Sequence, residues 1–146
     1  MAINRANSPG QLGETLWRST TLTHSQILGL ADSTVELVST PGDGYFIEFV
    51  SMVLVAKLVE PYADGSGLSV YYGTWDVASA TINKTALQQT YNNLFLGVVP
   101  IQQTGPVSDL GNQPLVLDGG NTAFTAGNIA NTLTCKVSYR VWPTGL

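Results

Sequence analysis

The run YFIEFVSMVLVAKLVE, residues 45–60, constrains the fold more than any other part of this sequence. Both the odd-numbered and the even-numbered positions of the run are mostly apolar, and β-branched and aromatic side chains dominate, which favours a strand over a helix. The turn signal Pro-Gly-Asp-Gly at 41–44 precedes the run, and Pro61 follows it. The run therefore predicts one long strand. Because strands of about 5–6 residues are usual, we also expect a bulge or kink near Ser51 or Ala56.

Weak alternation in this run indicates that both of its faces are covered, since a strand with one wet face alternates between apolar and polar residues. Leaving the large side chains of the odd-numbered face in water would forgo burial energy on the order of 10 kcal/mol. The sequence leaves three covers open: a second sheet, a folded arm or a neighbouring subunit. The candidate self-interface residues on this face are Tyr45, Ile47, Phe49, Val53 and Val55.

Composition limits the classes of function. The 146 residues are enough for one domain with its own core, and only 11% of them are charged, which suits β-rich proteins with extensive interfaces. The net charge is −4 and the Lys and Arg residues are scattered, so we expect no direct partner among nucleic acids, which need clustered cations. Glu48 and Lys57 interrupt the central run, so we expect no membrane span.

The polar segment 1–17 predicts an extended N-terminal arm, followed by a single β-sandwich domain over 18–146. Pro9 and nearby glycines disfavour a helix in this arm, and no apolar stretch marks it as a secretory signal. Trp17 is its one large aromatic residue, and it either plugs the core of the domain or anchors the arm on a neighbour. The candidate partner-binding residues of the arm are Arg5, Leu12, Leu16 and Trp17.

Short periodic segments fill the rest of the chain. We expect strands over 18–23, 34–39, 68–72, 77–82, 94–102, 115–117 and 133–141, and helical turns over 24–30 and 83–89. The turn at 41–44 predicts that segment 34–39 pairs with the central run as a hairpin. About eight strands at short spacing with little helix predict an all-β fold, an antiparallel β-sandwich of the jelly-roll type with one or two short helical turns.

Candidate catalytic and metal-binding residues are few. His24 is the only histidine and Cys135 the only cysteine, so an intrachain disulfide is excluded and a histidine metal site would lack ligands. Cys135 falls on the apolar side of its strand, where a small buried side chain is expected. Asp64 and Asp76, which flank one predicted strand, are the only acid pair to inspect for glycosidase chemistry. We expect no cofactor, no metal and no enzymatic activity.

Five segments resemble, in their order along residues 34–143, a family of small structural proteins of tailed phages and prophages. The segments are VELVSTPGDG at 35–44, LSVYYG at 68–73, SATI at 79–82, QPLVL at 113–117 and VSYRVWP at 137–143. Members of this family are similar to capsid decoration (cement) proteins, which have a β-sandwich fold and assemble as trimers.

The resemblance implies a homotrimer that is synthesised in the host cytoplasm, binds the major capsid protein on the exterior of the virion and stabilises the phage head. Low charge and the doubly apolar central run suit such a role, because obligate interfaces are hydrophobic. A second reading is a glycan-binding module of a phage tail tip or fibre that contacts the host. In that reading Tyr62, Tyr71, Trp75 and Tyr91 would form a platform for stacking sugars.

Overall fold

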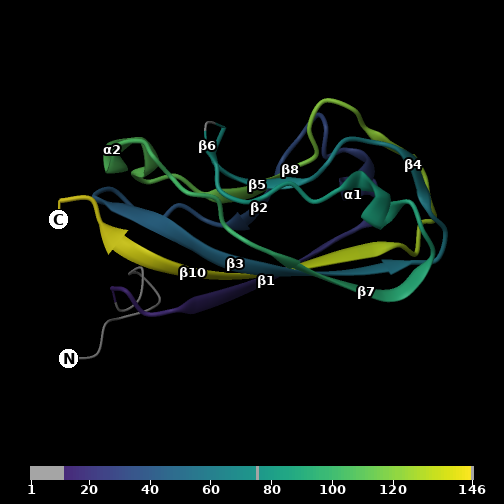
Figure 1. Cartoon of the computed structure of the whole chain (residues 1–146), viewed down its shortest axis with the longest axis horizontal. Helices are drawn as coiled ribbons and strands as arrows, with labels where there is room; N and C mark the ends of the chain where they lie inside the picture. Colours follow the sequence, from purple (N-terminus) through teal and green to yellow (C-terminus); the bar gives the residue numbers. More distant parts are fainter. Residues whose placement is uncertain (1–11, 75, 146) are drawn as a thin grey trace.

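Two antiparallel sheets packed face to face form the body of the molecule in the computed structural model, which describes residues 12–74 and 76–145 (Figure 1). Sheet A contains β1 (Leu16–Leu22), β10 (Thr132–Pro143), β3 (Tyr45–Leu58) and β7 (Tyr91–Val98), in that order. Sheet B contains β2 (Val35–Val38), β8 (Leu115–Asp118), β5 (Ser69–Tyr72) and β6 (Asp76–Val77). A small sheet pairs β4 (Tyr62–Asp64) with β9 (Phe124–Ala126). The helical segments are α1 (His24–Leu28), the 3₁₀ turn η1 (Lys84–Leu87) and α2 (Val107–Leu110).

The order of the strands is that of a jelly roll. The first strand, β1, lies beside the last, β10, in sheet A, and β2 lies beside β8 in sheet B. Strands from the beginning and the end of the chain therefore pair with each other in both sheets. All pairings of named strands are antiparallel. The predicted all-β sandwich is confirmed. Thr23 and Gln26 form a capping box at the start of α1, which lies within the helical turn expected over 24–30.

A bulge in β3 explains the weak alternation of the central run. Ser138 of β10 pairs with Ser51, whereas the next residue, Tyr139, pairs with Phe49, so Val50 is the extra residue. Odd-numbered side chains therefore face the core before the bulge, and even-numbered ones face it afterwards. The bulge expected near Ser51 is confirmed, and a second irregularity in pairing with β7 follows Ala56.

One hydrogen bond joins the two sheets at this bulge. The backbone N–H of Phe49 donates to the hydroxyl oxygen of Tyr72 on β5, at 3.0 Å, and the Tyr72 side chain is only 3% exposed. Burial raises the pKa of the Tyr72 phenol above its usual value, the carboxylate of Glu48 adds to the rise, and the bond from Phe49 opposes it. An amide at the bulge is thus paired inside the core.

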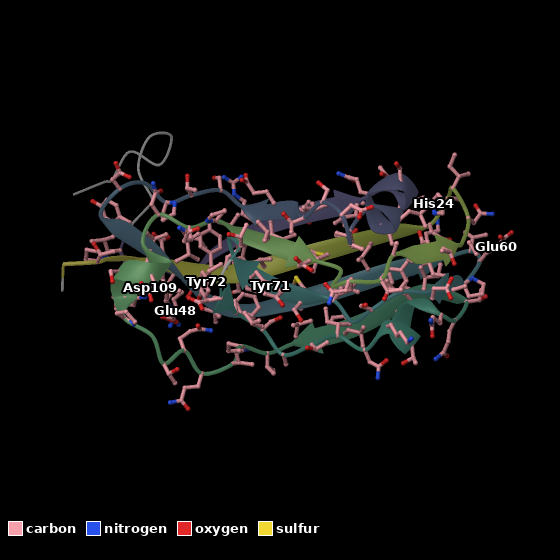
Figure 2. All side chains as sticks on the ribbon, turned by 90° about the horizontal axis from the view of Figure 1, so that it is seen from above. His24, Glu48, Glu60, Tyr71, Tyr72 and Asp109 are labelled. Atoms are coloured by element: carbon pink, nitrogen blue, oxygen red, sulfur yellow. The ribbon has the colours of Figure 1, made fainter. Side chains whose placement is uncertain are left out.

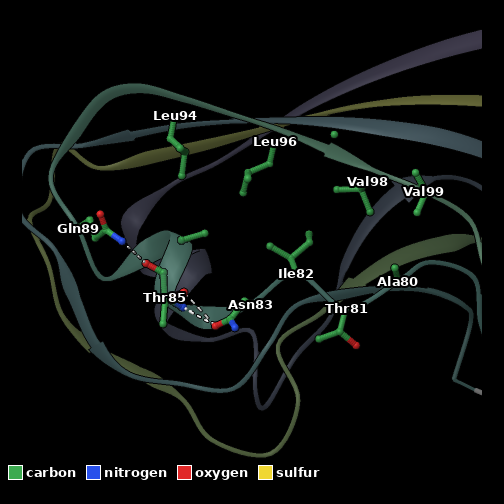
Figure 3. Close-up of a pocket in the computed structure, with 12 residues that line it drawn as sticks. Ala80, Thr81, Ile82, Asn83, Thr85, Gln89, Leu94, Leu96, Val98 and Val99 are labelled. Atoms are coloured by element: carbon green, nitrogen blue, oxygen red, sulfur yellow. Dashed lines mark hydrogen bonds between the residues drawn. The ribbon is translucent and has the colours of Figure 1, made fainter.

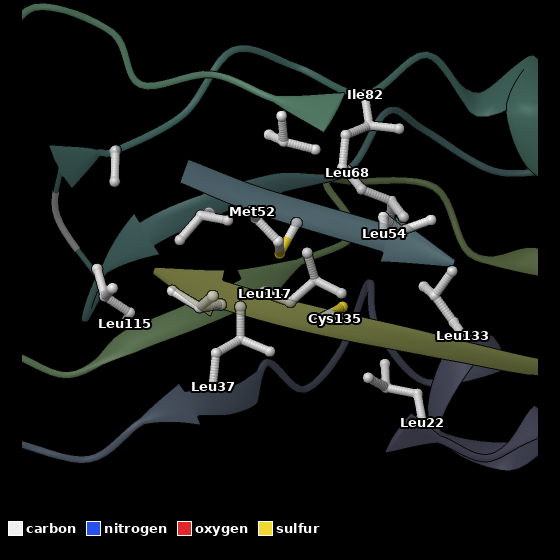
Figure 4. Close-up of a cluster of buried hydrophobic side chains, with 14 of the residues drawn as sticks. Leu22, Leu37, Met52, Leu54, Leu68, Ile82, Leu115, Leu117, Leu133 and Cys135 are labelled. Atoms are coloured by element: carbon white, nitrogen blue, oxygen red, sulfur yellow. The ribbon is translucent and has the colours of Figure 1, made fainter. Parts of the chain in front are cut away.

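Apolar side chains from both sheets, many of them leucines, fill the space between the sheets (Figure 4). Leu54 and Leu133 come from sheet A and Leu117 comes from sheet B, and all three are fully buried. Cys135 is also fully buried, as expected, and burial raises the pKa of its thiol to about 12. This core positions sheet A so that its opposite face points away from sheet B.

The structure corrects the expected hairpin between segment 34–39 and the central run. β2 pairs with β8 in sheet B, and the turn at 41–44 carries the chain across to sheet A. Gly42 and Gly44 adopt positive φ there, a conformation that glycine tolerates without strain, and the Gly42 N–H donates to Asn112 Oδ1 at 3.0 Å. The strand expected over 77–82 is also shorter, since β6 ends at Val77.

Candidate assembly surface

The outer face of sheet A, turned away from sheet B, carries a contiguous apolar patch. Val55 of β3 pairs with Phe95 of β7, and the neighbouring Val53 pairs with Gly97. Phe95 is 67% exposed, and both valines are partly exposed. We call Val53, Val55 and Phe95 the outer patch. Directly paired side chains on one face of a sheet touch, so the patch is one surface at the β7 edge.

Trp17 stands at the opposite edge of the same face. It pairs with Ser138 of β10 and is 63% exposed. Ser138 in turn pairs with Ser51 of β3 and is buried. Sheet A therefore presents an exposed aromatic side chain at each of its two edges, and exposed aromatic residues are the usual anchors of protein interfaces.

One cluster of paired polar groups lies on another part of the outer face. The Glu48 carboxylate accepts a hydrogen bond from Arg140 Nη1 at 3.2 Å and another from Trp142 Nε1 at 3.0 Å. Arg140 Nε also donates to Thr15 Oγ1 at 3.3 Å. These side chains bind one another at the far end of β10. Polar residues also border the outer patch: Thr134 pairs with Val55, and the exposed Lys136 pairs with Val53. The exposed Lys57 follows two residues after Val55 on β3.

The segment before β1 runs along β10 and past this polar cluster. The N–H of Gly13 donates to the carbonyl of Val141 at 3.1 Å, and a Cβ on Gly13 would lie 2.7 Å from the Trp142 ring. Only glycine, with its positive φ at this position, fits under that ring. The chain therefore leaves sheet A at a fixed point beside Trp142.

The predicted self-interface residues do not all lie on the same face of sheet A. Ile47 and Phe49 are 0% and 4% exposed, because the bulge turns this part of β3 toward the core, so their assignment to a self-interface is wrong. Tyr45 is partly exposed and packs against the core. Val53 and Val55 lie on the outer face as expected. Phe95 was missed, although Leu94, Leu96 and Val98 alternate around it and mark it as the outward residue of its strand.

The predicted arm residues fall into three groups. Arg5 lies outside the described residues. Leu12 is 44% exposed. Leu16 and Trp17 belong to β1, where Leu16 pairs with Tyr139 and packs against the core, so the sandwich begins at Leu16, two residues before the expected boundary.

A pocket of about 390 Å³ lies beside the β7 edge, between β7 and the segment around η1 (Figure 3). Leu94, Leu96 and Val98 line it from β7, and Ile82 and Ala86 line it from the other side. None of its described lining residues is ionisable, so the pocket lacks side chains for acid–base catalysis. It is an apolar hollow next to an exposed sheet edge.

The described residues also bear on the candidate metal, membrane and acid sites. No three His, Cys, Asp or Glu side chains gather there to hold a metal ion, and no described helix has the length and apolar content to cross a membrane. The His24 ring stacks on Tyr62, whose hydroxyl lies 3.0 Å from Nδ1. Asp64 lies in β4 and accepts from Thr125 at 2.6 Å, whereas Asp76 lies in β6 of another sheet.

One of the four residues expected to form a sugar platform is buried. Tyr62 is 3% exposed and packs between His24 and Phe124, so it offers no face to a ligand. Tyr71 is partly exposed on β5. Trp75 and the side chain of Tyr91 lie outside the described residues.

Comparisons with known proteins bear only on overall shape. No protein-family model matches the chain, and no curated protein matches it either. Among solved structures, a chain of the cyanophage Pam1 capsid asymmetric unit is similar, with a TM-score of 0.47 and 14% identity over 95% of this chain and 97% of that one. A likeness this distant carries no argument about function.

Proposed function

We propose that this chain is a structural protein of a phage virion, a capsid decoration protein that assembles with copies of itself and binds the major capsid protein on the outside of the head. The observation that carries the proposal is the outer face of sheet A, where Trp17, Val53, Val55 and Phe95 are exposed or partly exposed. In a chain with so few charged residues, such a surface fits a protein interface.

The order of the five phage-like segments supports the same role. Four of them overlap strands that build the sandwich, β2, β5, β8 and β10, so the resemblance runs through the fold itself. A decoration protein needs a rigid body, a self-interface and a contact with the shell, and it needs no catalytic group. We propose accordingly that the chain is not an enzyme and uses no cofactor.

Binding to the shell is tested with heads of the phage that carries this gene, purified from a strain in which the gene is deleted. We expect the full-length chain to sediment with these heads to saturation. A variant lacking residues 2–11 should lose binding but keep the mass of the full-length assembly, because β1 begins only at Leu16. Failure of the full-length chain to bind would contradict the proposal.

A glycan array separates this role from that of a host-binding module. A decoration protein should give no signal on the array. Tyr62, one residue of the expected platform, is buried and cannot stack on a sugar. Saturable binding to a glycan, together with no binding to heads, would replace the decoration role by recognition of the host.

A further inference from the structure

The two edges of sheet A differ from those of sheet B in a way that points to their use. β1 has 7 residues and β7 has 8, whereas the edge strands of sheet B, β2 and β6, have 4 and 2. β2 contains Glu36 and β6 contains Asp76. Short strands and charged side chains are the usual protection of an edge against pairing with another chain. Sheet B has this protection at both edges.

The β7 edge has neither of these two protections. Its sequence, YNNLFLGV, contains no charged residue and no proline. Within residues 12–74 and 76–145, β7 pairs only with β3, and the backbone bonds to the segment around Ala80 begin only after it, at the Val99 carbonyl. The β7 edge is therefore a row of backbone donors and acceptors open to another strand.

Gly97 strengthens this reading. Its φ is not positive, and a Cβ built on it would meet nothing within 4 Å, so neither the conformation nor the packing of the single chain requires glycine there. Glycine within a strand often marks a place where another backbone approaches closely. Gly97 lies at the outer patch, directly opposite Val53.

We infer that the β7 edge of one copy pairs with the β1 edge of the next, joining the two copies through a continuous sheet. This deepens the proposed function and rests on its self-assembly. β1 is the other long edge of the same sheet, of nearly equal length, and contains a single charge, Arg18. Three successive antiparallel pairings make β1 antiparallel to β7. A rotation about an axis parallel to the strands leaves the strand directions unchanged, so β1 of the next copy is also antiparallel to β7 of the first.

The pairing also joins the two exposed aromatic side chains of the outer face. With the edges side by side, Trp17 of one copy stands on the same face as Phe95 of the next, beside Val53 and Val55. The β1 and β7 edges lie on opposite sides of the molecule (Figure 2), where His24 marks the end of β1. The β1 edge of one copy therefore cannot pair with the β7 edge of the same copy. Like-with-like pairing of β7 would leave every β1 edge open. Head-to-tail pairing occupies both edges, and it forms a ring when the rotation between copies closes and a filament when it does not.

The test compares Phe95→Lys and Gly97→Lys with Ile129→Lys. Phe95 and Gly97 have room for lysine in the single chain. Ile129, 88% exposed, lies in the loop between β9 and β10, outside both edge strands, and its replacement matches the change in charge. Light scattering should show the wild-type assembly for Ile129→Lys, and an association weakened at least about 30-fold for the two edge variants. Circular dichroism should show all three variants folded.

Amide hydrogen exchange decides whether the contact is strand pairing. In the wild-type assembly, outward-facing amides of both β1 and β7 should be protected, and dilution to monomers or Phe95→Lys should expose both sets together. Assembly of the wild type with both edges unprotected would overturn the inference and leave self-assembly standing, as would edge variants of unchanged mass. A wild type that is monomeric would instead refute the proposed self-assembly.

Discussion

Replacing Tyr72 by phenylalanine tests the account of the β3 bulge. The substitution removes the hydroxyl that accepts the Phe49 N–H at 3.0 Å and leaves the ring in place. Because Phe49 and Tyr72 are 4% and 3% exposed, water cannot readily replace the lost partner. A buried amide without an acceptor costs about 1–3 kcal/mol, so we expect Tyr72→Phe to lower the free energy of unfolding by that amount.

The matched control is Tyr71→Phe, one residue earlier on the same strand. Tyr71 is partly exposed, and removing its hydroxyl should change stability by no more than about 0.5 kcal/mol. Urea unfolding followed by tryptophan fluorescence measures both variants. All samples need the same protein concentration, because association adds to apparent stability. A Tyr72→Phe protein that is no less stable than Tyr71→Phe would refute the proposed role of this bond.

The pH dependence gives a second readout of the same residue. Burial raises the pKa of folded Tyr72, so the phenol stays protonated in the folded chain at a pH where the unfolded chain ionises. Its contribution is complete below about pH 10, the pKa of an unperturbed tyrosine, and is lost as the pH rises through the folded value. The stability difference between wild type and Tyr72→Phe should therefore shrink above about pH 10.

Two further substitutions test the end and the interior of sheet A. Asn131 is fully buried; it accepts hydrogen bonds from the N–H groups of Val59 and Glu60 at 2.7 and 3.3 Å and donates one to the Glu60 carbonyl at 2.7 Å. Asn131→Ala should therefore lower the free energy of unfolding in urea by about 2–4 kcal/mol. A decrease smaller than that caused by Asn128→Ala would contradict this role. Burial raises the pKa of the Cys135 thiol to about 12, so the thiol should resist thiol reagents at pH 8 until the chain unfolds. Between about pH 8.5 and 12 the free energy of unfolding of the wild type should fall more steeply than that of Cys135→Ala, by up to about 1.4 kcal/mol per pH unit. Rapid labelling of the native thiol would refute its burial.

Local pattern was enough to predict most strands of the sandwich. The alternation over 133–141 and the apolar run at 45–60 became the two central strands of sheet A, because side-chain periodicity is a local property of a strand. Pairing partners are not local. The Pro-Gly-Asp-Gly turn at 41–44 has the composition of a hairpin turn, yet it carries the chain between sheets, and packing against β8 decides where β2 lies.

The candidate surface was predicted only in part, and a single residue explains why. Val50 bulges from β3 and reverses the direction of every side chain before it relative to those after it. Strict alternation therefore placed Ile47 and Phe49 on the face of Val53 and Val55, where they do not lie. The exposure of Phe95 depends also on β7 being an edge strand, which among the described residues pairs only with β3.

The mass of the wild-type chain in solution tests the central claim most directly. Light scattering over a wide range of concentrations should give three times the chain mass, with little change on dilution, because Trp17 and the outer patch are then buried between copies. A mass equal to that of one chain at every concentration would contradict self-assembly through sheet A.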